Sequence, residues 1–141
     1  MSSSVAGMTE ILRFLIDHAQ FLYAPGRYRF VDSGTSTSLG GDAFLVLASD
    51  AMRIRLVNDR GQLFADFQGA GQDGDLDWYS IDVVRRLITG EQPATAELSP
   101  DYAVFLERHL DAIERRFAEE GPSTVKELKE LEKARAKELF G

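Results

Sequence analysis

Residues 43–68 read AFLVLASDAMRIRLVNDRGQLFADFQ, and this stretch decides the fold. Its first six residues are apolar without a break, which is typical of a strand at the centre of a sheet. Over residues 52–57 apolar and basic side chains alternate, as in a strand with one buried and one wet face. The tetrapeptide Asn58-Asp59-Arg60-Gly61 is typical of a tight hairpin turn, and alternation resumes over 63–68. The stretch therefore predicts three consecutive antiparallel strands.

A fourth strand is expected before this stretch. In residues 27–32, two aromatic side chains alternate with Arg and Val. Residues 33–41 are small and polar, which is typical of a loop, and they lead into the next strand. Because all the connections are short, the four strands are predicted to form an antiparallel meander.

Apolar residues at helical spacing lie on both sides of the meander. The apolar residues of 9–23 recur every three or four positions, with Thr9 as the expected N-cap. A short helix is expected over 81–89, and Ser99 followed by Pro100 is typical of the start of a longer one. One helix before the sheet and three after it predict an α+β fold, a two-layer sandwich with the helices on one face.

The composition divides the chain into three parts. Residues 1–8 are mostly small or polar, so we expect a disordered N-terminus. Residues 9–120 form the predicted α+β domain, a length that suits one hydrophobic core. Residues 121–141 form a charged C-terminal helix, with a capping box suggested by Thr124 and Glu127. Its apolar stripe is narrow, so we expect it to pack on the domain, on a second copy of the chain or on another partner.

The composition also limits the class of function. The chain has no cysteine, which excludes disulfides, thiolate metal sites and thiol nucleophiles. The net charge is −7, and residues 71–120 account for it, with 5 Lys or Arg against 12 Asp or Glu. A phosphate backbone needs a basic face, so we expect no nucleic-acid partner. No apolar run has the length of a membrane span and the first residues do not form a signal peptide, so we expect a cytoplasmic protein without a membrane partner.

Sequence motifs of catalysis and metal binding are missing. The chain has no Gly-x4-Gly-Lys-Ser/Thr loop, no Gly-x-Ser-x-Gly elbow and no His-Glu-x-x-His pair. His18 and His109 are expected to be partly buried structural residues. The acidic run that begins at Asp73 suggests calcium, but an EF-hand loop would need glycine and glutamate where Trp78 and Val84 stand. We therefore expect no metal, no cofactor and a non-catalytic chain, with a cryptic enzyme as the minor alternative.

One segment suggests a binding surface. Asp73, Asp75 and Asp77 come directly before Trp78 and Tyr79. Trp and Tyr are frequent anchors at protein interfaces, and acidic groups steer basic partners. These five residues are the predicted contact site for a basic protein. The alternative is that the aromatic side chains turn inward and close the end of the sheet.

Three segments carry a resemblance to known proteins: NDRGQLF (58–64), WYSIDVVRRLITG (78–90) and residues 98–117. They resemble a group of small actinobacterial proteins without assigned chemistry. In character these are similar to the immunity proteins of bacterial polymorphic toxin systems, which are compact acidic α+β domains that bind and block a toxin. The resemblance covers residues 9–120. It implies a binding protein and assigns no functional residue.

These observations predict a non-catalytic protein-binding module, of the immunity or inhibitor type, that neutralises a basic toxin or enzyme. Two alternatives stay open. One is a homo-oligomeric adaptor that pairs through the 123–141 helix or through a sheet edge. The other is a domain that binds a small ligand between the sheet and the helices.

Overall fold

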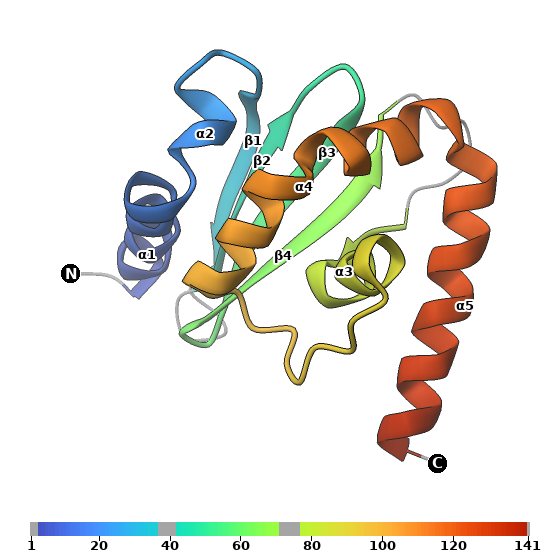
Figure 1. Cartoon of the computed structure of the whole chain (residues 1–141). Coiled ribbons are helices and arrows are strands. Elements are labelled where there is room, and N and C mark those ends of the chain that lie inside the picture. The colour runs from blue at the N-terminus through green and yellow to red at the C-terminus, as the bar shows by residue number, and fades with distance from the viewer. Residues whose placement is uncertain (1–2, 37–41, 71–76, 141) are drawn as a thin grey trace.

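The computed structural model describes residues 3–36, 42–70 and 77–140, and its centre is a five-stranded antiparallel sheet (Figure 1). The strands lie side by side in chain order: β1 (Arg29–Ser36), β2 (Asp42–Ala48), β3 (Met52–Asp59), β4 (Gln62–Gly69) and β5 (Tyr79–Ser80). The predicted α+β class and antiparallel meander are confirmed. The prediction of four strands is corrected to five, because β5 has only two residues and so short a strand shows no alternation.

β3 and β4 are joined by a two-residue turn, as the sequence predicted. Asp59 pairs with Gln62, so only Arg60 and Gly61 lie between the strands. Both have positive φ angles, 55° and 89°, which a two-residue turn needs to match the twist of its strands. The Asn58 side chain accepts a hydrogen bond from the Gly61 amide at 2.9 Å and closes the turn.

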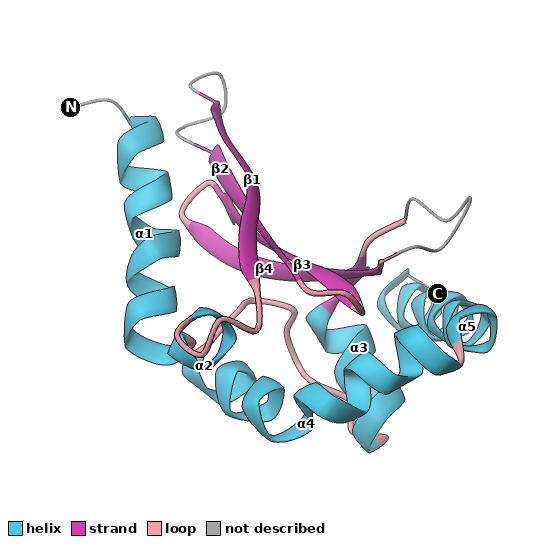
Figure 2. Cartoon of the chain, turned by 90° about the horizontal axis from the view of Figure 1, so that it is seen from above, coloured by secondary structure: helices cyan, strands magenta, loops and turns pink. Residues whose placement is uncertain are grey.

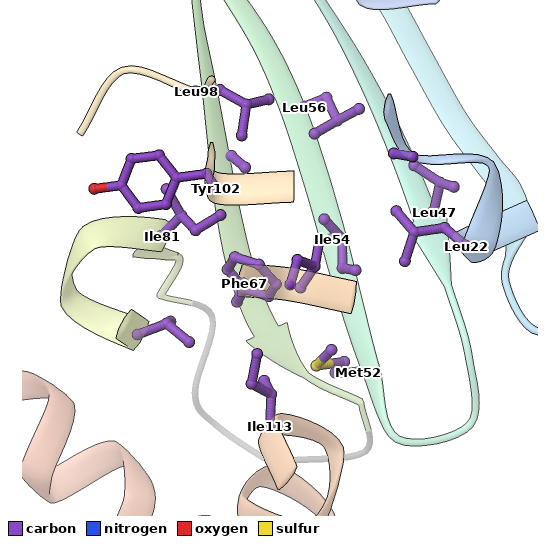
Figure 3. Packing of buried hydrophobic residues seen from close by; sticks show 14 of the residues in the cluster. Leu22, Leu47, Met52, Ile54, Leu56, Phe67, Ile81, Leu98, Tyr102 and Ile113 are labelled. Carbon is purple, nitrogen blue, oxygen red and sulfur yellow. The ribbon is translucent and has the colours of Figure 1, made fainter. Parts of the chain in front are cut away.

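The helices form a second layer on one face of the sheet (Figure 2). They are α1 (Ser3–His18), α2 (Gln20–Tyr23), α3 (Ile81–Thr89), α4 (Pro100–Glu119) and α5 (Gly121–Phe140). α1 contacts β2 and β3, α4 contacts β3 and β4, and α3 contacts β4 and β5. In the core between the layers, Leu47, Ile54 and Phe67 from the sheet lie together with Ile81 and Ile113 from the helices (Figure 3). No helix in the described part of the chain crosses the opposite face of the sheet.

The N-terminal helix begins earlier than predicted. α1 starts at Ser3, so the described residues 3–8 are helical and Thr9, the expected N-cap, lies inside the helix. A tertiary contact supports these first turns, because the Asn58 side-chain amide donates to the Gly7 carbonyl oxygen at 3.2 Å. Serine, valine and glycine have weak helix propensity, which is why local sequence did not indicate the early start.

α5 packs on the same domain. Leu128 is fully buried, and Val125 and Leu131 pack against the core. Thr124 lies inside the helix, and its hydroxyl donates to the Arg116 carbonyl oxygen at 2.6 Å. The predicted capping box at Thr124 is therefore wrong, because the helix already begins at Gly121. The narrow apolar stripe is used within the chain.

Ion pairs add to this contact between α5 and the rest of the domain. They join Lys129 to Asp77 at 2.6 Å, Arg135 to Asp82 at 2.9 Å, Glu138 to Arg86 at 3.1 Å, and Glu127 to Arg116. Ion pairs at exposed sites contribute ~0–1 kcal/mol each, so most of the docking energy is expected from the buried leucine and its neighbours.

Candidate functional site

A groove lies on the face of the sheet that the helices leave open. It has a volume of about 790 Å³, and side chains from all five strands line it. Most of the lining residues of one strand are two positions apart, because alternate residues of a strand point to the same face. They include Phe44 and Val46 in β2, Arg55 and Val57 in β3, and Phe64 and Asp66 in β4.

The sheet register arranges these side chains in two rows across the strands. The apolar row consists of Gly34, Phe44, Val57 and Phe64, which are successive partners from β1 to β4. The second row lies two residues along each strand and is called the polar row. It consists of Asp32, Arg55, Asp66 and Ser80, with the buried Val46 between Asp32 and Arg55. The groove therefore has an apolar strip beside a strip of polar and charged groups.

Gly34 allows the Phe44 ring to lie over β1. A Cβ atom at position 34 would collide with two carbon atoms of the Phe44 ring and lie close to a third. The ring is held close to the sheet and stays partly exposed. A larger residue at position 34 would push the ring out and change the shape of the apolar row.

Trp78 closes the groove at the β5 side. The Arg55 guanidinium lies over the indole ring, 4.5 Å from its centroid. Asp66 orients the same guanidinium, because its Oδ2 accepts from Arg55 Nη2 at 2.8 Å and from Nε at 3.3 Å. A cation over an aromatic face at a partly exposed site contributes ~0.5–1 kcal/mol, enough to favour one ring orientation. The only tryptophan of the chain thus lies against the groove in a defined position.

Carboxylates dominate the charge of the groove. Asp42 and Asp59 flank the apolar row on one side, and Asp32 and Asp66 lie in the polar row on the other side. Among the described residues that line the groove, Arg55 is the only cation, and it is already paired with Asp66. An apolar strip between carboxylates suits a ligand that carries both apolar groups and positive charge.

Two contacts from α5 hold the chain on either side of Trp78. Lys129 Nζ donates to Asp77 Oδ2 at 2.6 Å, and this hydrogen bond raises the pKa of the Lys129 ammonium group. Arg135 Nη1 donates to the Ser80 hydroxyl at 2.8 Å and to Asp82. α5 therefore positions β5 and the adjoining end of the groove.

The predicted partner site lies only partly on this surface. Trp78 lines the groove, and Asp77 is exposed beside it. Tyr79 is fully buried, because neighbours on a strand point to opposite faces and its ring enters the core. The structure gives Tyr79 no surface on which to contact a partner. Asp73 and Asp75 lie outside the described residues.

The histidines lie elsewhere. His18 is exposed near the end of α1, which corrects its expected partial burial, and its ring centroid is 5.3 Å from that of Phe14. His109 is half-buried in α4, with its ring centroid 5.2 Å from that of Phe105. Within residues 3–36, 42–70 and 77–140, no group of three or more metal-ligating side chains is found. No helix in those ranges combines the length and the apolar character of a membrane span.

Sequence reasoning did not single out Phe44, Val57 or Phe64. The unbroken apolar run of β2 predicted a strand at the centre of the sheet, and within this run Phe44 is only partly buried. The alternation in β3 and β4 indicated one wet face, and that face is the groove. The sequence could not indicate these residues because it does not show which face of the sheet the helices cover.

The chain was compared with models of protein families, with curated proteins and with solved structures, and no match was found in any of the three comparisons. Its function is therefore argued from the groove.

Proposed function

We propose that the chain is a protein-binding module whose groove takes a segment of a basic partner protein. The observation that carries the proposal is the apolar row, Gly34 to Phe64, flanked on both sides by aspartates on a sheet face without helices. The bound segment would place apolar side chains on Phe44, Val57 and Phe64. Its Lys or Arg side chains would pair with the flanking carboxylates.

The charge of the groove favours this occupant over an acidic or nucleic-acid partner. Asp66 is paired with Arg55 and Asp59 lies 3.8 Å from Arg60, but four aspartates line the groove against one arginine. An anion would meet this excess of negative charge, which costs binding energy, whereas a cation gains binding energy from it. A salt-sensitive association rate is expected for such a partner.

The biological role that we propose is inhibition of a basic toxin or enzyme. In this role the aspartates of the groove occupy the place of an anionic substrate, and the apolar row supplies affinity. The overall charge of −7 supports this role. A catalytic activity forms no part of the proposal.

The test compares captures from the source cell's lysate with three baits. Wild type is set against Val57→Lys, which places a cation in the apolar row, and against Val104→Lys, which makes the same change at an exposed site on α4. A basic protein retained by wild type and Val104→Lys, and bound about tenfold or more weakly by Val57→Lys, supports the proposal. Equal retention by all three baits would place the binding surface elsewhere.

A second variant keeps the proposal testable if Val57→Lys fails to fold. Asp59→Asn removes one exposed carboxylate of the groove and leaves its apolar row intact. Its affinity for the captured protein should depend less on salt than that of wild type. An unchanged salt dependence would mean that the groove carboxylates do not take part in binding the partner.

A small ligand is the second candidate, because the groove volume of about 790 Å³ lies in the range of ligand pockets. The chemistry of the lining would favour an apolar cation. Trp78 is the only tryptophan, so its fluorescence reports on this site directly. A saturable change with a hydrophobic amine, absent in Val57→Lys, would favour the small ligand.

A further inference from the structure

β1 is the free edge of the sheet. Within the described residues it pairs only with β2, and on the opposite edge β5 has only two residues and is held by α5. β1 has eight residues, so its outer backbone groups offer a long template for another strand. In a monomer such an edge needs protection, and a second strand is the most direct form of protection.

Apolar side chains are exposed along this edge. Phe30 is 52% exposed and Val31 is 49% exposed, and both lie in β1. In α1, which contacts β1, Leu12 and Ile16 are 43% and 58% exposed. Among the described residues only six large apolar side chains are exposed, and four of them lie on these two elements. Grouped apolar exposure of this kind is typical of an interface.

A β-bulge gives this edge a charge pattern that is complementary to itself. Phe30 pairs with Leu47 and Asp32 pairs with Val46, so Val31 is the additional residue of the bulge. Arg29 pairs with Ala48, two residues from Val46, and therefore points to the same sheet face as Asp32. Without the bulge, residues three apart would point to opposite faces.

We propose that β1 pairs in antiparallel fashion with β1 of a second copy, with Arg29 opposite Asp32 of the second copy. The same register places Phe30 opposite Val31 of the second copy. A two-fold axis repeats both contacts, so the interface has two ion pairs and two apolar pairs. Opposite charges and apolar groups in direct cross-strand positions both stabilise pairing.

The present contacts of Asp32 fit this pairing. Its carboxylate accepts a hydrogen bond from the amide of the next residue, Ser33, at 2.9 Å. In the pair, the Ser33 amide faces the second copy's strand, and the carboxylate turns to Arg29 of that copy. The two sheets then continue into one another, and both grooves lie on the same face. The pairing uses Asp32 at the margin of the groove and leaves the apolar row of the groove uncovered.

Cysteine cross-linking tests the register, because the natural chain has no cysteine. Arg29→Cys and Asp32→Cys are prepared as separate full-length proteins, mixed, and oxidised with glutathione disulfide. The mixture should give a disulfide-linked dimer, while each protein alone should give far less, because identical positions lie about three residues apart across the strands. The mixed dimer retains one Arg29–Asp32 ion pair. Equal cross-linking in the mixture and in the separate proteins would overturn the register.

Charge reversal tests the same contact in solution by sedimentation velocity. Arg29→Asp places two like charges opposite each other at both ends of the interface. The dissociation constant of the dimer should therefore rise about tenfold. The double variant Arg29→Asp/Asp32→Arg restores the pairs in reversed order and should restore the dimer. Arg108→Asp makes the same charge change at an exposed position on α4 and should leave the dimer intact. A wild-type chain that stays monomeric at its highest soluble concentration would overturn the proposal.

Discussion

At the residue scale, Glu132 shows how burial changes the ionisation of a carboxyl group. Glu132 lies half-buried in α5. Burial has the largest influence and raises the pKa of Glu132 above its ordinary value of 4.5, although Arg135 and Lys129 lower it. A carboxyl whose pKa is higher in the folded chain favours folding below its unfolded pKa. This contribution is lost as the pH rises through the folded pKa.

We predict that Glu132→Gln stabilises the chain at pH 7, by less than about 1 kcal/mol, because the amide carries no charge to be buried. The gain should fall toward zero as the pH drops below the pKa of Glu132, since the wild-type carboxyl then becomes neutral too. Urea unfolding at several pH values measures both effects. Glu130→Gln, at an exposed position of the same helix, is the control and should change little. A gain that is equal at all pH values would contradict the role of burial.

At the element scale, α5 combines one buried leucine with ion pairs at its margins. Leu128 is fully buried, whereas Leu139 near the end of the same helix is 67% exposed. Lys129 and Arg135 connect the helix to Asp77 and to Asp82. Asp82 is nearly buried, so it depends on this partner more than an exposed carboxylate would.

We predict that Leu128→Ala lowers the free energy of unfolding by ~2–5 kcal/mol, the usual cost of a cavity at a buried leucine. Leu139→Ala removes the same atoms from an exposed site and should cost less than about 0.5 kcal/mol. Urea denaturation of the two variants measures the difference. Similar losses for both would mean that α5 does not dock through Leu128.

At the scale of the whole molecule, α5 is coupled to the groove through β5. Arg135 contacts Ser80, Lys129 contacts Asp77, and Trp78 lies between these two positions in the chain. Removal of α5 would take Arg135 away from Asp82 and would uncover the core residues against which Leu128 packs. Stability and groove shape are therefore expected to change together.

We predict that a chain ending at Glu120 unfolds at a lower urea concentration than Leu128→Ala and shows altered Trp78 fluorescence before unfolding. The urea midpoint and the emission maximum are the two measurements. A chain ending at Glu138 keeps the ion pair between Arg86 and Glu138 and should behave like wild type. Normal fluorescence in the chain ending at Glu120 would show that the groove forms without α5.

The sequence by itself determined most of the elements and their order. Alternation over residues 52–57 and 63–68, the turn at Arg60-Gly61 and the cap at Ser99 are local signals, and the structure has a strand, a hairpin and a helix start at these places. These features could be predicted because they depend on residues close together in the chain. β5 and the first turns of α1 were missed, since their support comes from residues far away in the sequence.

Only the tertiary structure determined where the groove lies and which residues line it. The open sheet face, the two rows of the groove and the burial of Tyr79 depend on the register of five strands and on which face the helices cover. Alternation assigns residues to two faces but does not say which face is buried. In the same way, the sequence shows Arg29 and Asp32 three residues apart. The bulge at Val31 turns both to one face, because the pairing with β2 adds a residue there.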